Sequence, residues 1–287
     1  MISNIPVDIS GYGKNVKLSL IQDEEIGKKY LKGLEISSGK IITFLDDDDL
    51  FYETRLEKIM DFYNRHDGPV YYHNSFSFVD LDGKDIKSSF KKFSLQFSNK
   101  GKPMFIKMDG KLRKLVKAKK FAADFNMSST AVSREVITEN SNLLFSSKKT
   151  PDLYLFLETI RQGIPIYLDP ERLTKYRLRP DMQVKSLPNN IKTGHAQQDA
   201  RDEIVSVALK SGNKIFLRYS YFEKYDYLSF SELRKFKNSQ KRERRMAFDN
   251  LRKLPLTKIY LMPYFSKYLI LYILLLFYPD LIIYLDI

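Results

Sequence analysis

A run of four aspartates, Asp46 to Asp49, constrains this sequence more than any other feature. It follows directly on an apolar run, Ile41 to Leu45, and a second apolar group, Leu50 to Tyr52, closes it. Like charges at the end of a buried strand are costly unless a hard cation neutralises them. Mg2+ or Mn2+ takes carboxylate oxygens and keeps coordination positions for phosphate. The pattern therefore indicates a metal-diphosphate site, or else an acidic turn in which one aspartate caps the next helix.

Composition limits the classes of protein that can carry such a site. The chain has 287 residues, 43% of them hydrophobic, which is enough for one large α/β domain with an appendage. Its net charge of +13 and pI near 9.5 indicate anionic partners, such as phosphate-bearing small molecules, an acidic membrane surface or nucleic acid. The sequence contains no cysteine, which excludes disulfides and thiolate chemistry. Its first residues predict no secretory signal.

Strands and helices are expected to alternate around the aspartates. The apolar run before them is continuous, which is typical of a strand buried on both faces of a parallel sheet. The aspartates would then lie at the carboxyl end of a strand, where open α/β sheets bind ligands. The expected elements are a strand at Val16–Leu20, a helix at Glu24–Ser37, a strand at Ile41–Leu45, and a helix at Thr54–Tyr63 with Leu56, Ile59, Met60 and Tyr63 on its apolar face.

The next segment, Val70 to Val79, is rich in aromatic residues and predicts another strand, with a hairpin turn at Asp80–Lys84. His73 lies within this strand. No second histidine stands at metal-ligand spacing, so a packed or surface histidine is favoured over a metal ligand.

A second acidic position begins a later helix. Thr150 is a natural N-cap and Pro151 suits the first helical position, while Gly163 ends the helix before a strand at Ile164–Leu168. Asp152 therefore lies in the first helical turn, where the helix dipole stabilises a carboxylate whatever else it does. From local sequence alone, a structural aspartate is the favoured interpretation.

Five elements between about residues 16 and 186 together resemble family 2 glycosyltransferases of the GT-A fold. The resemblance implies an α/β fold with an incomplete Rossmann-like sheet of the nucleotide-diphospho-sugar transferases, followed by a helical, basic and hydrophobic C-terminal extension. The five elements are the run from Gly39 to Asp49, Asp80-Leu-Asp-Gly83, Ser128-Ser129 before Arg134, the Thr150-Pro-Asp152 helix with its Arg161-Gln-Gly163 end, and Tyr176-Arg-Leu-Arg-Pro180.

The resemblance also implies roles for the acidic residues. The Asp-x-Asp element of the family binds a divalent metal, Mg2+ or Mn2+, and the sugar-nucleotide diphosphate, and it matches Asp46 and Asp48, with Asp49 as their neighbour. The catalytic base of the family opens the later helix and matches Asp152, which reverses the interpretation from local sequence.

Two departures from the family accompany these matches. The family's Tyr-Arg-x-His element ends here in Arg179, which cannot ligate a cation, although Arg177 and Arg179 could both bind the diphosphate as charged forks. The strand and loop that hold the nucleotide base, and the next strand with its aspartate, are not evident upstream of Val16. The chain therefore looks shortened at its amino terminus, and a protein partner could supply the missing half.

The expected function is inverting transfer of a sugar from a nucleotide-diphosphate sugar to an acceptor hydroxyl, with a lipid-linked or cell-surface glycan as acceptor, as in polysaccharide biosynthesis. The absent strands favour an alternative, a non-catalytic glycosyltransferase-like subunit. The positive charge and the many Phe and Tyr residues favour a nucleic-acid-binding protein. Those aromatic residues follow strand and helix periodicities, however, so no nucleic-acid partner is expected.

The C-terminal part of the sequence predicts membrane association. Arg234 to Lys258 is strongly basic, and Ile259 to Leu285 is almost wholly apolar but is interrupted by Pro279 and Asp280. An interfacial or re-entrant anchor beside anionic lipid at the cytoplasmic face of the membrane is favoured, with a hydrophobic hairpin buried on protein as the alternative. The expected domains are 1–186, 187–258 and 259–287, with an amphipathic helix at Ala200–Leu209 in the second.

Overall fold

The computed structural model describes residues 1–11, 13–22, 25–86, 102–108, 115, 118–119, 121–137, 150–178 and 191–224, except for the side chains of 191–197 and 200. The chain divides into two units, Met1–Val184 and Lys185–Ile287. The first unit contains all the described strands. The described part of the second unit is helical.

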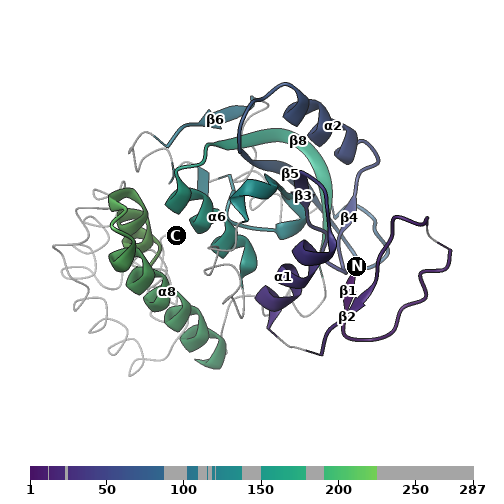
Figure 1. Ribbon diagram of the computed structural model, residues 1–287, viewed down its shortest axis with the longest axis horizontal. Coiled ribbons are helices and arrows are strands. Elements are labelled where there is room, and N and C mark those ends of the chain that lie inside the picture. The colour runs from purple at the N-terminus through teal and green to yellow at the C-terminus, as the bar shows by residue number, and fades with distance from the viewer. Residues whose placement is uncertain are drawn as a thin grey trace. The chain divides into compact units, whose positions relative to one another are not determined.

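A six-stranded sheet forms the body of the first unit (Figure 1). Its strand order is β3-β7-β5-β8-β4, and β6 pairs with β8 outside this path. The central pair, β5 and β8, is parallel, whereas the other described pairs of this sheet are antiparallel. The strands are β3 (Ile41–Thr43), β4 (Leu50–Phe51), β5 (Tyr71–Val79), β6 (Met104–Ile106), β7 (Thr130–Ser133) and β8 (Ile166–Arg177).

The strand before the aspartates differs from the expected one. Among the described strands, β3 lies at one end of the order and pairs with β7 alone. The pairing is antiparallel, so the expectation of a strand within a parallel sheet was wrong. Its residues are half-buried. A short apolar run does not specify how many strands flank it. Just after β3, the Phe44 ring packs against Tyr30 of a helix, with ring centroids 5.3 Å apart.

The last strand is longer than the sequence predicted. Instead of ending near Leu168, β8 continues through Pro170 to Arg177. Proline has no backbone N–H to give to a ladder, and the pairing with β5 shifts register around Ser75, opposite this segment. This irregularity lets the strand continue, so that its end reaches the acidic loop.

Two helices cover opposite faces of the sheet. Tyr71 of β5 contacts Phe156 of one helix at 5.7 Å between ring centroids, and its neighbour Tyr72 contacts Phe62 of another at 5.1 Å. Successive residues of a strand point to opposite faces, so α6 and α2 lie on different sides of β5 (Figure 1). The helices with described bounds in this unit are α1 (Ile26–Ile36), α2 (Arg55–Asn64) and α6 (Pro151–Gln162), with short 3-10 turns η1 (Met127–Ser129) and η2 (Arg134–Val136).

The bounds of the expected helices in the first unit agree with the structure to within two residues. The apolar face predicted for α2 is not the face that the helix buries. Ile59 and Phe62 are buried, whereas Leu56 and Met60 are 52% and 48% exposed. The helix is turned so that Arg55 is fully buried, which a count of apolar residues could not reveal.

Several local expectations are met. The turn after β5 is present, since Asp80 Oδ1 accepts a hydrogen bond from the Lys84 N–H at 2.9 Å. His73 is buried, and its Nε2 lies 2.9 Å from the Phe125 carbonyl oxygen. Burial lowers its pKa to about 4, as expected for a packed histidine.

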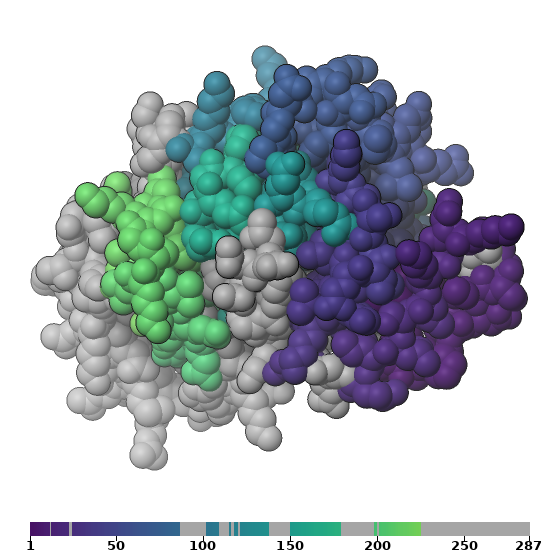
Figure 2. Space-filling model, viewed as in Figure 1, coloured from purple at the N-terminus to yellow at the C-terminus, as the bar shows by residue number. Residues whose placement is uncertain are grey.

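The amino-terminal residues form a small parallel pair, β1 (Ile2–Ser3) with β2 (Ser19–Leu20), so the strand expected from Val16 begins later. In the space-filling view these residues, in purple, lie against α1 (Figure 2). A Cβ atom at Gly33 of α1 would contact the Ile2 side chain at 3.6 Å.

The described part of the second unit consists of α8 (Ile191–Ser211) and a helix over residues 214–224. The amphipathic helix expected at Ala200–Leu209 is thus confirmed and is longer. Within the residues that the structure describes, no helix has both the length and the apolarity needed to cross a membrane. The basic and apolar segments at 234–285, which carry the membrane prediction, lie outside these residues.

Candidate functional site

The acidic loop leaves β3 as a tight turn. The Asp49 N–H donates to the Asp46 carbonyl oxygen at 3.2 Å. The Asp46 N–H donates to the hydroxyl oxygen of Ser128 at 2.9 Å, which ties the loop to η1. Asp49 is buried, and its Oδ1 accepts a hydrogen bond from the Arg177 N–H at 3.0 Å. The loop is therefore held by residues that lie far from it in the sequence.

Arg177 holds the same loop through its side chain. Its Nε donates to the Asp48 carbonyl oxygen at 2.6 Å, and its Nη1 donates to the carbonyl oxygens of Asp80 and Leu81. The end of β8 thus joins the acidic loop to the hairpin turn after β5. The expected contact of Arg177 with a diphosphate stays a prediction, because two guanidinium nitrogens already bond to protein carbonyls. Arg179 lies outside the described residues.

Asp152 lies in the first turn of α6, as expected. Its Oδ1 accepts the N–H of Leu153 at 2.9 Å, and its Oδ2 accepts the N–H of Asn126 at 3.0 Å. Thr150 occupies the N-cap position in a left-handed conformation, with φ of 54°, and its side chain makes no capping hydrogen bond. The predicted N-cap position of Thr150 is therefore confirmed, but its side chain does not cap the helix. Asp152 itself accepts one of the first N–H groups of the helix.

The two acidic positions face one site. Asn126 binds Asp152, its side-chain Oδ1 accepts the N–H of Ser128 at 3.0 Å, and Ser128 binds the Asp46 N–H. A single turn therefore contacts both carboxylate-bearing segments. The structure brings Asp46, Asp48, Asp152 and the Arg177 side chain into one neighbourhood, which the sequence predicted from elements over a hundred residues apart.

Electrostatics agrees with this geometry. Burial raises the pKa of Asp152 to about 7, and the nearby charges of Asp124 and Asp46 raise it further, while the two backbone N–H donors act against them. Burial also raises the pKa of Asp46 to about 6, with the charge of Asp48 adding to the effect. The carboxylates thus interact with one another across the site.

Two tyrosines at the site were not recognised from the sequence as functional. The Tyr30 hydroxyl donates to Asp46 Oδ1 at 3.3 Å. Burial raises the pKa of Tyr176 to about 12, and the charges of Asp49, Asp48, Asp152 and Asp46 raise it too. Nothing in the periodicity of the helix expected at Glu24–Ser37 signals that the Tyr30 hydroxyl faces an aspartate.

Asn126 was also not recognised from the sequence as a residue of the site. In the structure its backbone conformation is unusual. Its φ is 66°, a left-handed conformation that asparagine tolerates better than most residues. Its side chain caps the η1 turn through the Ser128 N–H. A single asparagine before Met-Ser-Ser gives no local warning of this geometry.

The residues present fit a divalent cation held jointly with phosphate. Asp49 Oδ2 is buried and has no hydrogen-bond partner among the described residues, and the pKa of Asp49 is raised to about 6 by burial. Within the described ranges, no group of three or more histidine, cysteine, aspartate or glutamate side chains could hold a metal ion by itself. Mg2+ is usually bound by one or two carboxylates, with phosphate and water completing its coordination, which Asp46 and Asp48 can provide.

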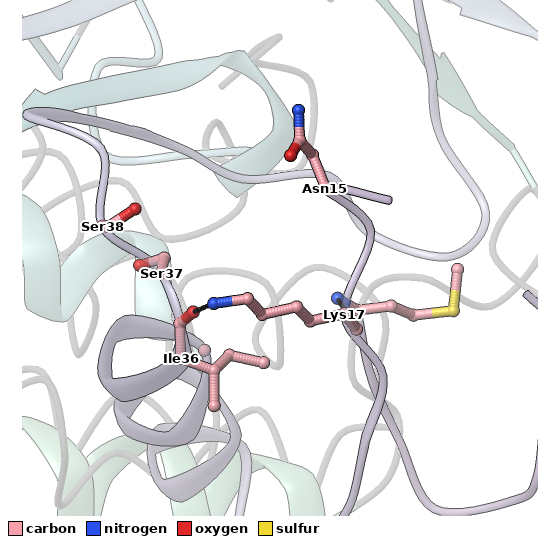
Figure 3. A pocket seen from close by; sticks show the side chains of 7 residues that line it. Asn15, Lys17, Ile36, Ser37 and Ser38 are labelled. Carbon is pink, nitrogen blue, oxygen red and sulfur yellow. Dashed lines mark hydrogen bonds between the residues drawn. The ribbon is translucent and has the colours of Figure 1, made fainter. Parts of the chain in front are cut away.

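A separate pocket of about 270 Å3 lies between the amino-terminal residues and the end of α1 (Figure 3). The Lys17 side chain crosses this pocket, and its Nζ donates a hydrogen bond to the Ile36 carbonyl oxygen at 3.3 Å. No carboxylate lines this pocket. Its lining residues are Met1, Asn15, Lys17, Gly33, Ile36, Ser37 and Ser38.

Comparison with known proteins agrees with the interpretation of the sequence. Residues 11–139 match the family model described as glycosyl transferase family 2. Among solved structures, the crystal structure of S. aureus TarS is similar to 89% of this chain at 12% sequence identity, with a TM-score of 0.53. The chain covers 43% of the length of that structure. A search of curated proteins finds no relative. The fold is therefore GT-A, as the resemblance implied.

Proposed function

We propose that this chain, which carries a glycosyl transferase family 2 domain over residues 11–139, is an inverting glycosyltransferase that moves a sugar from a nucleotide-diphosphate sugar to an acceptor hydroxyl. One observation supports this most strongly. The Asn126–Ser129 turn contacts both the acidic loop and Asp152, so the loop that would bind the diphosphate lies close to the carboxylate that would act as the base.

Asp152 is suited to act as the general base. It would accept the proton of the acceptor hydroxyl while that oxygen attacks the anomeric carbon from the face opposite the leaving group. A base works best when its pKa lies near the working pH, and the pKa of Asp152 is raised to about 7 by burial. Two backbone N–H groups orient its carboxylate.

The acidic loop is suited to the diphosphate end of the donor. A divalent metal bound there would neutralise negative charge on the leaving nucleoside diphosphate. Asp46 and Asp48 would hold the cation, while the Tyr30 hydroxyl orients Asp46 and Arg177 fixes the loop backbone. Arg177, with Arg179 beyond the described residues, would add positive charge near the leaving group.

The acceptor and the place of action are inferred from the sequence. The basic segment and apolar tail favour a chain bound at the cytoplasmic face of a membrane, acting on a glycan or glycolipid acceptor in polysaccharide biosynthesis.

The test is turnover by the purified full chain. Nucleotide-diphosphate sugars are incubated with Mn2+ or Mg2+, and released nucleoside diphosphate is measured for the parent and for Asp152→Asn. We expect turnover by the parent and a loss of at least about 100-fold in the variant, because general-base catalysis contributes that much or more.

Asp61→Asn is the matched control, since it removes an exposed carboxylate on α2 that pairs only with Arg65, at 3.7 Å, among the described residues. It should keep parental activity. A parent that turns over no sugar nucleotide, or an Asp152→Asn variant that is as active as the parent, would favour a non-catalytic subunit instead.

A further inference from the structure

The turn that joins the two acidic positions is built from buried polar groups. Asn126, Ser128 and Ser129 are all buried. The Asn126 side chain binds both serines, accepting the Ser128 N–H and donating to the Ser129 hydroxyl oxygen, each at 3.0 Å. Buried hydrogen bonds of this kind are costly to leave unmade, so the turn holds one geometry.

The turn is anchored to the centre of the sheet. The Thr174 hydroxyl of β8 donates to the Ser128 carbonyl oxygen at 3.1 Å. Asn74 of β5 donates to that same hydroxyl at 2.9 Å and accepts a hydrogen bond from Arg55 Nε at 3.2 Å. A continuous polar network therefore runs from α2 through both central strands to η1.

The turn contacts the two acidic segments through two different residues. The Asn126 N–H binds the Asp152 carboxylate, and the Ser128 hydroxyl binds the Asp46 N–H. Asp46 follows β3 and Asp152 lies in α6. This turn forms hydrogen bonds with both residues. The turn therefore links the backbone of the Asp46 loop to the Asp152 carboxylate.

We propose that Ser128 is a positioning residue that, through the rigid Asn126–Ser129 turn, holds the Asp46 loop at the distance from Asp152 that sugar transfer requires. The inference rests on the proposed function and assigns a further residue to it. Ser128 touches no reacting atom; it acts through the backbone of Asp46. Groups that orient metal-binding side chains typically contribute 10- to 100-fold in metal affinity or activity.

The test compares Ser128→Ala with Ser133→Ala in the full chain. Both serines accept a distant backbone N–H through their hydroxyl oxygens, Ser128 from Asp46 at 2.9 Å and Ser133 from Val70 at 3.2 Å. Only the first lies at the acidic loop, so Ser133→Ala reports the general cost of losing one such hydrogen bond.

Two quantities are measured: Mn2+ binding in the presence of a nucleoside diphosphate, by electron paramagnetic resonance, and turnover as a function of Mn2+ concentration. For Ser128→Ala we expect about 10-fold weaker Mn2+ binding, a matching rise in the Mn2+ concentration for half-maximal rate, and a lower kcat at saturating Mn2+. Ser133→Ala should match the parent in all three.

If both variants bind Mn2+ and turn over donor alike, the inference is overturned while the proposed function stands. If the parent turns over no donor, the proposed function fails and the inference falls with it. Should Ser128→Ala not fold, Asn126→Gly tests the same link, because glycine adopts the positive φ easily and removes both side-chain bonds of the turn. It should weaken Mn2+ binding in the same direction, and parental binding would overturn the proposal.

Discussion

At the scale of single residues, Asp152 has the environment of a base that works near neutral pH. Its carboxylate is buried, lies near other aspartates, and is held by two N–H donors. The burial and the neighbouring charges outweigh the donors, so its pKa lies at about 7 rather than 3.8. The residue is therefore divided between its two protonation states in the range where most cellular reactions occur.

This environment predicts a pH dependence with a definite sign. A base must be ionised to accept a proton, and a raised pKa means that ionisation is completed only above about pH 7. We expect kcat/KM to rise as pH increases through 7, with roughly one tenth of the maximal value at pH 6. Steady-state kinetics between pH 5.5 and 9 measures this.

Replacing the base should remove the rise. The small residual rate of Asp152→Asn should show no such limb near pH 7. A parental profile that is flat between pH 6 and 8, or that falls over this range, would contradict the assignment of Asp152.

At the scale of elements, α2 is fastened to the sheet by a buried arginine. Arg55 is fully buried, its guanidinium lies 4.0 Å from the Phe51 ring centroid, and it donates to Asn74 and to the Thr130 carbonyl oxygen. Burial lowers the pKa of Arg55 to about 10, so it stays charged at neutral pH. Its role is to join α2 to the network that also holds Ser128.

Removing this side chain should destabilise the fold. Arg55→Ala leaves Asn74 Oδ1 and the Thr130 carbonyl oxygen without their buried donors and opens a cavity beside Phe51, so we expect a loss of about 3 kcal/mol in the free energy of unfolding. Arg65→Ala, at the exposed end of the same helix, should change it by less than about 0.5 kcal/mol. Urea denaturation followed by circular dichroism compares the two, and equal losses would contradict this account of α2.

The elements also show which parts of the fold are accessible from sequence. Helix α6 could be placed because Pro151 and Gly163 mark its ends, and Gly163 does adopt the left-handed conformation, with φ of 74°. The full length of β8 could not be predicted, since Pro170 normally ends a strand and only the register shift opposite it allows continuation. The buried face of α2 was missed because a charged residue, Arg55, lies in the core.

For the molecule as a whole, the residues that lie together at the candidate site could be predicted more fully than the topology of the sheet. A run of charges beside an apolar strand, such as Asp46 to Asp49, indicates a ligand class through its residue types alone. The position of β3 at the edge of a mixed sheet depends on β7, which lies far along the chain, and no local pattern encodes that pairing. The hydrogen bonds of Tyr30, Asn126 and Ser128 to the aspartates also join residues far apart in the sequence, so no local pattern predicts them.

The central claim is that the acidic loop and Asp152 form one donor site. The most direct measurement is a crystal structure of the full chain with Mn2+ and a nucleoside diphosphate, with the metal located from its anomalous scattering. The account predicts an anomalous peak at bonding distance from carboxylate oxygens of Asp46 and Asp48, with the diphosphate on the side that faces Asp152. A peak bound elsewhere, or a diphosphate turned away from Asp152, would contradict it.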